Sequence, residues 1–453
     1  MRALSQTLVG LVQKHILNRP VLRKILSNAS WLVADRAMRM AVSLFVGMWV
    51  IRYLGPERYG IYSYALAFAA LFSPFADLGL RQIVVRNLVA EAETANLTLG
   101  TTFLLKLVGG VIAFGLPVAI IVLLRPHDII TCWLVGILSA RGIFRAFHVI
   151  GFFFQSRLQS KYTVAATGVA FLAANIGKIT LILVRAPLIA FAWVMVAESA
   201  IAAAGLLMGY RITGRRFRHL GATFQCARDL LRDSWPLILS GLAIAVYMRI
   251  DVIMLREMRG NEDAGIYAAA VRISSIWYFI PMAIASSAFP SIVEAKSANQ
   301  LLYIQRLQKL FNFGAGLSYA VAIPLTFLAG PVVRLLCGSG YSAAGPVLAI
   351  HIWAGLFSAL GTIRALWLVS EGLMKFSFAS TLAGMLANVL LNCCLIPSFG
   401  ALGAAVATVA SYSIVVLFSC FFYRRTHEVG FMILRSVVLA SLIFDRRNDG
   451  RVE

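Results

Sequence analysis

The sequence predicts an all-α, polytopic membrane protein of about 12 transmembrane helices, arranged as two pseudo-symmetric six-helix bundles around a central cationic cavity. Hydrophobic residues make up 60% of the 453 residues and charged residues only 13%, whereas a soluble protein carries about 25% charged residues. Apolar runs of roughly 20 residues, long enough to cross a bilayer, recur along the chain. A loop motif of the first half also returns in the second half.

The individual helices follow from a hydropathy window of roughly 20 residues. Gly, Pro and charged clusters separate the expected spans, which cover 30–51, 60–80, 99–124, 129–154, 162–184, 187–209, 235–255, 264–292, 310–333, 342–370, 373–396 and 401–422. The domains expected from these spans are a cytoplasmic N-terminal segment (1–29), an N-terminal bundle (30–209), a basic cytoplasmic linker (210–234), a C-terminal bundle (235–422) and a cytoplasmic tail (423–453). The tail contains an apolar run at 431–444 that is too short to span, so we expect a surface helix or the remnant of a further helix.

The basic residues of the connecting segments predict the orientation. With the N-terminus in the cytoplasm, the cytoplasmic segments hold about three times as many Lys and Arg residues as the outer loops, which is the bias of the positive-inside rule. The sequence therefore predicts that both termini are cytoplasmic.

Internal similarity indicates a duplicated half. The loop after the first expected span reads Gly-Pro-Glu-Arg-Tyr-Gly-Ile-Tyr over 55–62, and the loop after the seventh reads Gly-Asn-Glu-Asp-Ala-Gly-Ile-Tyr over 260–267. Gly-Ile-Phe-Arg-Ala at 142–146 is likewise matched by Gly-Thr-Ile-Arg-Ala at 361–365. Copies of six helices enter the membrane from the same side, so an axis along the membrane normal would relate them. Chance similarity between Gly/Ala-rich helices is the alternative.

Charged side chains inside the expected spans are the main functional signal. A charge at the centre of a membrane helix costs about 2.5–3.5 kcal/mol on insertion scales. The cations within spans are Arg36, Arg39, Lys106, Arg141, Arg145, Lys178, Arg249, Arg272 and Arg364. The acids are fewer: Asp35, Asp77, Glu198 and Asp251. The excess of cations predicts a water-filled cavity that holds an anion within the bilayer.

Several motifs together resemble one transporter family. Residues 52–62, Arg-Tyr-Leu-Gly-Pro-Glu-Arg-Tyr-Gly-Ile-Tyr, resemble the first-loop signature of the polysaccharide-biosynthesis, or O-antigen-type, flippases. Asp-Leu-Gly-Leu at 77–80, followed by Arg86 and Asn87, fits the exit of their second helix. Asn388 and Asn392, with Ile-Pro at 396–397 and the small-residue run 400–408, resemble their helix 11–12 hairpin.

The resemblance covers residues 25–425 and implies a member of the multidrug/oligosaccharidyl-lipid/polysaccharide exporter superfamily. Such a protein would flip undecaprenyl-pyrophosphate-linked oligosaccharide units across the bacterial inner (plasma) membrane by alternating access. The implied partners are this polyprenyl-linked oligosaccharide, membrane lipid and a polysaccharide polymerase of the same pathway. No cofactor, metal or catalytic residue is expected. The chain departs from the larger members in lacking clear helices 13 and 14.

Arg145 and Arg364 are the leading candidates for headgroup binding. Arg141, Arg145 and His148 are spaced by four and three residues, so they form one stripe of the fourth helix. Arg364 occupies the matching place in the other half. The two guanidinium groups would face each other and clamp a pyrophosphate through several hydrogen bonds. Alternatively, each arginine pairs with a carbonyl or an acid and only holds helices together.

The first and seventh helices hold further candidates. Asp35 and Arg39 have the spacing of a helical ion pair, which would leave Arg36 to meet a lipid headgroup or to reach the interface. Arg249 and Asp251 are two residues apart and point to opposite faces, and we expect Arg249 to face the cavity.

The remaining candidates are single charges. Arg272 has no acid within four residues and is a cavity candidate, and Lys106 and Lys178 are weaker ones. Asp77 precedes Arg81 by four residues, which predicts an ion pair or a gate. Glu198 would either carry a proton or neutralise Lys178. Proton coupling or gating would need one of the acids, namely Glu198, Asp251, Asp35 or Asp77.

Three other functions fit this sequence less well. A multidrug/cation antiporter of the same superfamily would need an acid-rich cavity, opposite to the charge balance here. A membrane polysaccharide polymerase or ligase would need a large outer loop, and the outer loops are short. A nucleic-acid partner is not expected despite the net charge of +22, because the basic residues divide between membrane-flanking loops and helices. The aromatic residues, including Phe75, Phe152–Phe154, Trp277 and Tyr278, are expected mostly to face lipid or the membrane interface.

Overall fold

The computed structural model describes residues 20–90, 93–215 and 220–438; the side chains of residues 20–38, 41, 290 and 297–298 lie outside this description. Across these ranges the regular structure is helical, with no β-strand. In the same ranges nine helices are long and apolar enough to cross a membrane, or up to ten if the bent pair Val42–Leu71 and Ser73–Ala90 is one span. The predicted all-α, polytopic fold class is confirmed.

The described residues form two compact units. Unit 1 contains the residues through Gly47 together with Ala69–Leu242, and unit 2 contains Met48–Phe68 together with the residues from Ala243 onward. The helices α2 (Pro20–Leu71) and α10 (Phe224–Arg259) contribute to both units. Continuous halves at 30–209 and 235–422 remain a prediction.

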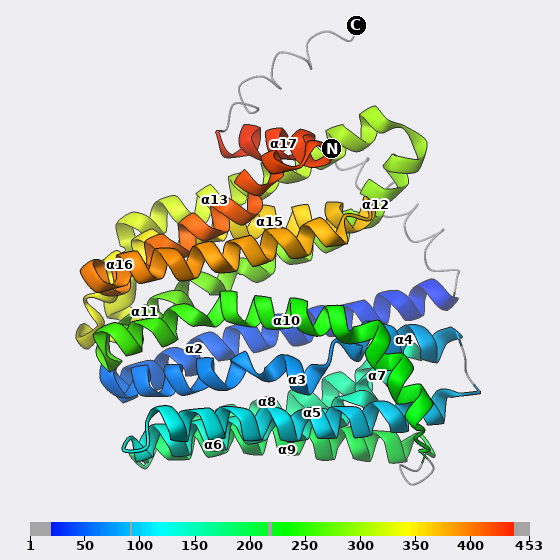
Figure 1. The fold of residues 1–453 in the computed structure, drawn as a ribbon, viewed down its shortest axis with the longest axis horizontal. Coiled ribbons are helices and arrows are strands. Elements are labelled where there is room, and N and C mark those ends of the chain that lie inside the picture. The colour runs from blue at the N-terminus through cyan, green and yellow to red at the C-terminus, as the bar shows by residue number, and fades with distance from the viewer. Residues whose placement is uncertain (1–19, 91–92, 216–219, 439–453) are drawn as a thin grey trace, which may run out of the picture. The chain divides into compact units, whose positions relative to one another are not determined.

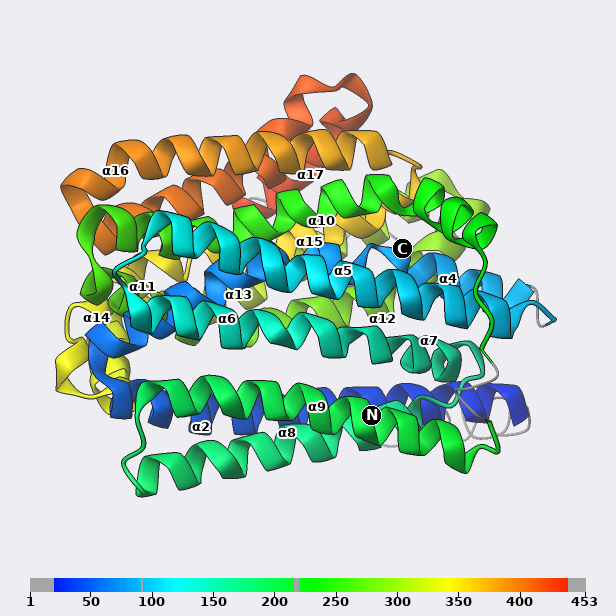
Figure 2. The same ribbon diagram turned by 60° about the horizontal axis from the view of Figure 1, so that its bottom comes forward.

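Unit 1 is built from long antiparallel helices and a broken one. Its other helices are α3 (Ser73–Asp77), α4 (Leu80–Ala90), α5 (Ala95–Leu124), α6 (Ile129–Phe144), the 3₁₀ turn η1 (Arg145–Phe147), α7 (His148–Ser156), α8 (Ser160–Leu183) and α9 (Leu188–Ile212). Figure 2 shows α8 and α9 side by side, and α5 pairs with α6 in the same way. Loop residues Arg216 and Arg218 lie outside the described residues.

Unit 2 is likewise built from helices packed side by side. It contains α11 (Asn261–Ser275), η3 (Ile276–Tyr278), α12 (Phe279–Ala298), α13 (Gln300–Cys337), η4 (Ser339–Tyr341), α14 (Ala344–His351), α15 (Ala354–Ser370), α16 (Met374–Val416), η5 (Phe418–Phe422), η6 (Arg424–Thr426) and α17 (His427–Val437). The short α17 packs on α13, where Gln308 donates to the Ser436 hydroxyl at 2.9 Å. The start of the apolar run 431–444 is therefore a docked helix, and residues from 439 lie outside the described part.

Several aromatic side chains were expected to face lipid and do not. Phe152, Phe153 and Phe154 are buried in the core of unit 1, where the Phe153 ring packs edge-on against Tyr210 of α9. Trp277 is buried in unit 2. The prediction was wrong for these residues because hydropathy alone does not distinguish the lipid-facing side of a helix from its packed side.

Among the described residues, fewer helices than the expected twelve pass the test of length and apolarity, and kinks at two glycines explain the difference. Gly55 interrupts α2 with φ 73° and ψ 168°, and Gly400 interrupts α16 with φ 55° and ψ −132°. These backbone conformations are open to glycine and costly for other residues. Figure 1 shows both ribbons reversing direction, so each continuous helix assignment contains two rods.

The backbone supports the predicted duplication. Gly260 precedes α11 with φ 101° and ψ −176°, close to the conformation of the corresponding Gly55. The break at Phe72, between α2 and α3, corresponds by the same offset to the 3₁₀ turn η3 between α11 and α12. Equivalent positions of the two halves thus share a turn and a helix break.

A close crossing inside unit 2 joins the two copies of the motif. A Cβ atom on Gly60 would clash with the carbonyl oxygen of Asn261, and a Cβ atom on Gly265 would clash with the carbonyl oxygen of Pro56. Gly60 corresponds to Gly265 in the repeat, and Pro56 corresponds to Asn261. The contact is reciprocal, and it requires glycine at both equivalent positions.

Candidate functional site

The broken helix of unit 1 ends in a backbone carbonyl that a lysine side chain reaches. Pro74 lies in the first turn of α3, and the helix ends at Asp77 because Leu78 adopts a left-handed conformation, followed by Gly79 with φ 62°. The last carbonyl groups of a helix lack intrahelical donors. The carbonyl oxygen of Ala76 is one of these groups, and it accepts a hydrogen bond from the Lys106 ammonium at 3.0 Å.

Two cations meet the Asp77 carboxylate at this helix end. Lys106 Nζ lies 3.4 Å from Asp77 Oδ1, and Arg145 Nη1 lies 2.7 Å from Asp77 Oδ2. The Lys106 side chain is 1% exposed, whereas those of Arg145 and Asp77 are 35% and 50% exposed. One acid therefore faces two cations, and part of the site remains accessible.

Small residues let the helices approach closely enough to form this site. A Cβ atom on Gly109 of α5 would clash with the carbonyl oxygen of Phe75 in α3, and one on Gly110 would lie 2.7 Å from the carbonyl oxygen of Gly142 in α6. Arg145 then follows at the start of η1, where the helix tightens. Irregular turns within a helix often coincide with functional positions.

Two further residues, Arg81 and His148, lie close to these charges. His148 lies within electrostatic reach of Lys106, Arg145, Asp77 and Arg81. The expected Asp77–Arg81 ion pair is not what the structure contains, because the Arg81 guanidinium donates to Gln155 at 3.1 Å while Asp77 pairs with Lys106 and Arg145. The set Asp77, Arg81, Lys106, Arg145 and His148 is called the Asp77 cluster below.

Arg364 has a different setting inside unit 2. Its side chain is only 4% exposed, and Nη2 donates to the hydroxyl groups of Ser380 and Ser419, each at 3.1 Å. The guanidinium also lies over the Phe376 ring, and its buried Nε has no hydrogen-bond partner among the described residues. Arg364 thus joins α15, α16 and η5 within one unit.

Asp251 lies at the centre of a second buried network. Its carboxylate accepts hydrogen bonds from Asn392 Nδ2 at 2.6 Å, from the Tyr267 hydroxyl at 2.7 Å and from the Thr408 hydroxyl at 2.9 Å. Asn388 joins the network through Asn392. Sequence reasoning did not assign Tyr267, Asn392 or Thr408 to the site, although two asparagines four residues apart in an apolar helix were a signal.

The other predicted residues are more dispersed. Arg249 is exposed on the opposite side of α10 from buried Asp251, and Arg141 donates to the Ser199 hydroxyl at 3.3 Å. Lys178, Glu198 and Arg272 are half-buried. Arg39 donates to the Thr167 hydroxyl at 2.9 Å, and the side chains of Asp35 and Arg36 lie outside the described residues.

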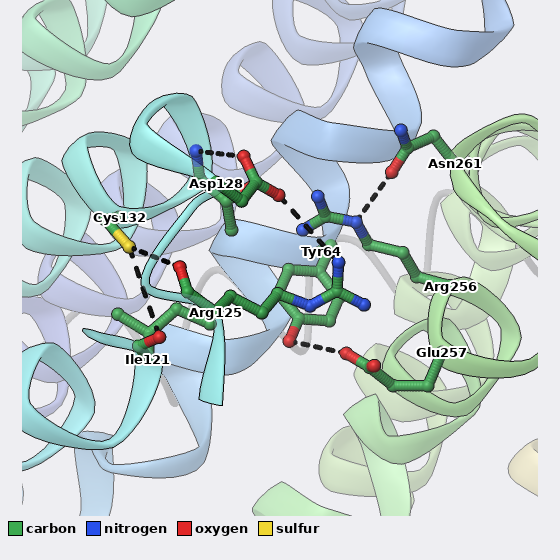
Figure 3. A network of polar contacts seen from close by, with 9 residues as sticks. Tyr64, Ile121, Arg125, Asp128, Cys132, Arg256, Glu257 and Asn261 are labelled. Atoms are coloured by element: carbon green, nitrogen blue, oxygen red, sulfur yellow. Dashed lines mark hydrogen bonds and ion pairs between the residues drawn. The ribbon is translucent and has the colours of Figure 1, made fainter. Parts of the chain in front are cut away.

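The end of α10 carries a further polar network within unit 2. Figure 3 shows the Tyr64 hydroxyl directed at the Glu257 carboxylate, at 2.8 Å, and the Arg256 guanidinium directed at the Asn261 side chain, at 2.6 Å. Arg256 also lies over the Tyr64 ring, 4.2 Å from its centroid. These contacts connect Tyr64, two residues after the first motif copy, through the end of α10 to Asn261 of the second copy.

An apolar cavity of about 510 Å³ lies elsewhere in unit 1. Its lining belongs to α5, α6, the turn between them and α9, and it includes Phe114, Trp133, Gly136 and Trp193. None of the lining residues is charged. Such a lining suits a hydrocarbon chain and would disfavour a charged headgroup.

Long apolar helices with charged networks among them define a multi-pass membrane protein. The backbone is similar to an inward-facing multidrug transporter of the MATE family, with a TM-score of 0.72 and 14% identity over 86% of this chain and 96% of the other. It is also similar to the lipid II flippase MurJ in an inward closed conformation, with a TM-score of 0.68 and 15% identity over 92% of both chains. Both likenesses concern the fold.

The chain belongs to the polysaccharide biosynthesis protein family, whose signature matches residues 25–296. The MatE signature also matches residues 236–394. The expected membership of the polysaccharide-biosynthesis family is thereby confirmed.

Two curated relatives have transport-related names. "Probable low-salt glycan biosynthesis flippase Agl15" of Haloferax volcanii is 23% identical over 49% of this chain and 49% of its own length. "Putative O-antigen transporter" of Shigella dysenteriae is 22% identical over 74% of this chain and 83% of its own length. This chain thus spans about half the length of the Haloferax volcanii relative.

Proposed function

We propose that this protein flips undecaprenyl-pyrophosphate-linked oligosaccharide units across the membrane by alternating access. The observation that carries the proposal is the Asp77 cluster, in which one carboxylate faces two cations and Arg145 is partly accessible. An anionic headgroup that enters an apolar membrane loses hydration, and fixed cations offset that loss. The names of the two relatives support a glycan-linked lipid as cargo.

The Asp77 cluster would receive the pyrophosphate while the polyprenyl chain stays in lipid. The predicted cavity residues Arg36, Arg141, Lys178, Arg249 and Arg272 are proposed to line the headgroup path. Arg364, which is buried and donates to Ser380 and Ser419, is proposed instead to hold helices of unit 2 together. The protein would act without catalysis, in the bacterial inner membrane, with both termini cytoplasmic and a polysaccharide polymerase as a partner in the pathway. Asp251 or another of the predicted acids would couple transport to a proton or act as a gate.

The direct test is flipping of a short polyprenyl-pyrophosphate oligosaccharide by purified protein in liposomes. We expect Arg145→Gln to reduce the initial rate at least about tenfold, because it removes a charge-assisted donor to phosphate. The matched control is Arg334→Gln, which removes an exposed arginine at the end of α13. Equal rates for Arg145→Gln and wild type would contradict the proposed headgroup site.

A cation-driven drug antiporter is the second candidate. The buried Asp251 network favours it, since a carboxylate in an apolar bundle can exchange a cation or a proton. The likeness to a multidrug transporter is consistent with it at the level of the fold. Ion-driven efflux of a cationic dye from proteoliposomes, without flipping of the oligosaccharide lipid, would support this candidate over the first.

A further inference from the structure

We propose that Asp77 occupies the substrate's anion position in the empty transporter, and that a bound diphosphate displaces it from Arg145. This inference rests on the proposed function and adds a regulatory role for a carboxylate of the same site. Asp77 would lower the affinity for anions in general and would help to release the headgroup after translocation.

The geometry places Asp77 where a phosphate oxygen would lie. Its two carboxylate oxygens contact different cations, with Oδ1 at 3.4 Å from Lys106 and Oδ2 at 2.7 Å from Arg145. A phosphate group likewise presents several oxygens to several donors. The carboxylate therefore imitates the contacts that a diphosphate would make with this pair of cations.

The two cations differ in how firmly they are held. Lys106 is almost fully buried and has a second partner in the Ala76 carbonyl, so its position does not depend on Asp77 alone. Arg145 is 35% exposed, and its hydrogen bond to Asp77 uses one nitrogen of a group with five N–H donors. Exchange of partners is consequently expected at Arg145, with Lys106 as the fixed member of the site.

The balance of charge favours exchange with a diphosphate over exchange with a weaker anion. An ion pair between partly exposed side chains is weak, because water competes with both partners. A diphosphate carries more negative charge than one carboxylate and can engage several N–H donors of Arg145 at the same time. A monovalent anion gains much less than Asp77 already provides.

The test measures binding of inorganic pyrophosphate to the purified full-length protein by calorimetry. Asp77→Asn removes the competing charge with little change in shape, and we expect it to tighten pyrophosphate binding about two- to fivefold. The matched control is Asp233→Asn, since Asp233 is 53% exposed and forms an ion pair of 3.3 Å with Arg86. That control should bind like the wild type.

The outcomes separate this inference from the proposed function. If pyrophosphate binding depends on Arg145 but Asp77→Asn binds no more tightly than the wild type, the displacement idea is wrong and the headgroup site stands. If Arg145→Gln binds pyrophosphate as well as the wild type, the proposed headgroup site itself fails.

A second measurement needs no variant and covers the case in which Asp77→Asn does not fold. Carbodiimide labelling of the wild type, followed by mass spectrometry, reports access to each carboxylate. Pyrophosphate should increase labelling of Asp77 and leave Asp233 unchanged. Protection of Asp77 by pyrophosphate would overturn the proposal.

Discussion

Two buried cations of this protein, Lys106 and Arg364, donate hydrogen bonds to groups of their own unit. Lys106 donates to the carbonyl oxygen of Ala76 at the end of α3, and Arg364 donates to the hydroxyl groups of Ser380 and Ser419. These contacts lower the cost of placing a cation among apolar helices. A charge in a membrane helix is therefore not by itself a substrate ligand, and accessibility distinguishes Arg145 from Arg364.

Variants around Arg364 can separate a structural role from headgroup binding. We expect Ser380→Ala/Ser419→Ala to lower the free energy of unfolding by about 1–3 kcal/mol, because a buried guanidinium loses its acceptors. Arg364→Met should cost less, because an apolar replacement of a buried polar group leaves no unpaired donor. Thermal unfolding in detergent measures both. A stable Arg364→Met variant that no longer flips lipid would instead assign Arg364 to the headgroup.

At the scale of helices, the repeated motif makes a contact that depends on the absence of side chains. Gly60 and Gly265 lie against the carbonyl oxygens of Asn261 and Pro56, which are the equivalent residues of the opposite copy. Gly55 and Gly260 supply the positive φ angles that precede the two crossing helices. The motif therefore encodes both a turn and a close helix crossing.

Alanine at the crossing is predicted to destabilise the protein. Gly60→Ala or Gly265→Ala forces the backbones apart, and we expect a loss of about 1–3 kcal/mol, as for other overpacked sites. Gly115→Ala is the matched control, because a Cβ atom there meets nothing within 4 Å. The control should be neutral or slightly stabilising, by up to about 1 kcal/mol, since alanine favours helix. A thermal shift equal to that of the control would mean that the crossing is not required.

At the scale of the whole molecule, two of the charged networks in the described residues differ in character. The Asp77 cluster in unit 1 has an excess of cations, and the Asp251 network in unit 2 has one acid surrounded by neutral donors. The first suits an anionic headgroup. The second suits a group whose charge changes during a transport cycle.

Neutralising Asp251 is predicted to uncouple transport from an ion gradient and to leave the fold intact. Asp251→Asn keeps a side chain of the same shape and can still accept hydrogen bonds from Tyr267 and Thr408. Flipping by the wild type in liposomes should respond to an imposed proton or sodium gradient, and flipping by the variant should not. Equal stimulation of both proteins would exclude Asp251 from coupling. Glu198→Gln is the comparison, because Glu198 is a half-buried acid outside this network.

The membrane fold, the duplicated motif and the family could be predicted from the sequence, because apolar length, loop charge and local motifs are encoded in contiguous residues. The sequence also identified Asp77, Lys106, Arg145 and Asp251 as unusual. The partners of these charges depend on the three-dimensional fold, in which Asp77 contacts Lys106 and Arg145 in place of the expected Arg81. Lys106 and Arg145 are 29 and 68 positions from Asp77 in the sequence. Their contacts with Asp77 depend on a helix break and on close packing at glycines, and the periodicity of apolar residues predicts neither.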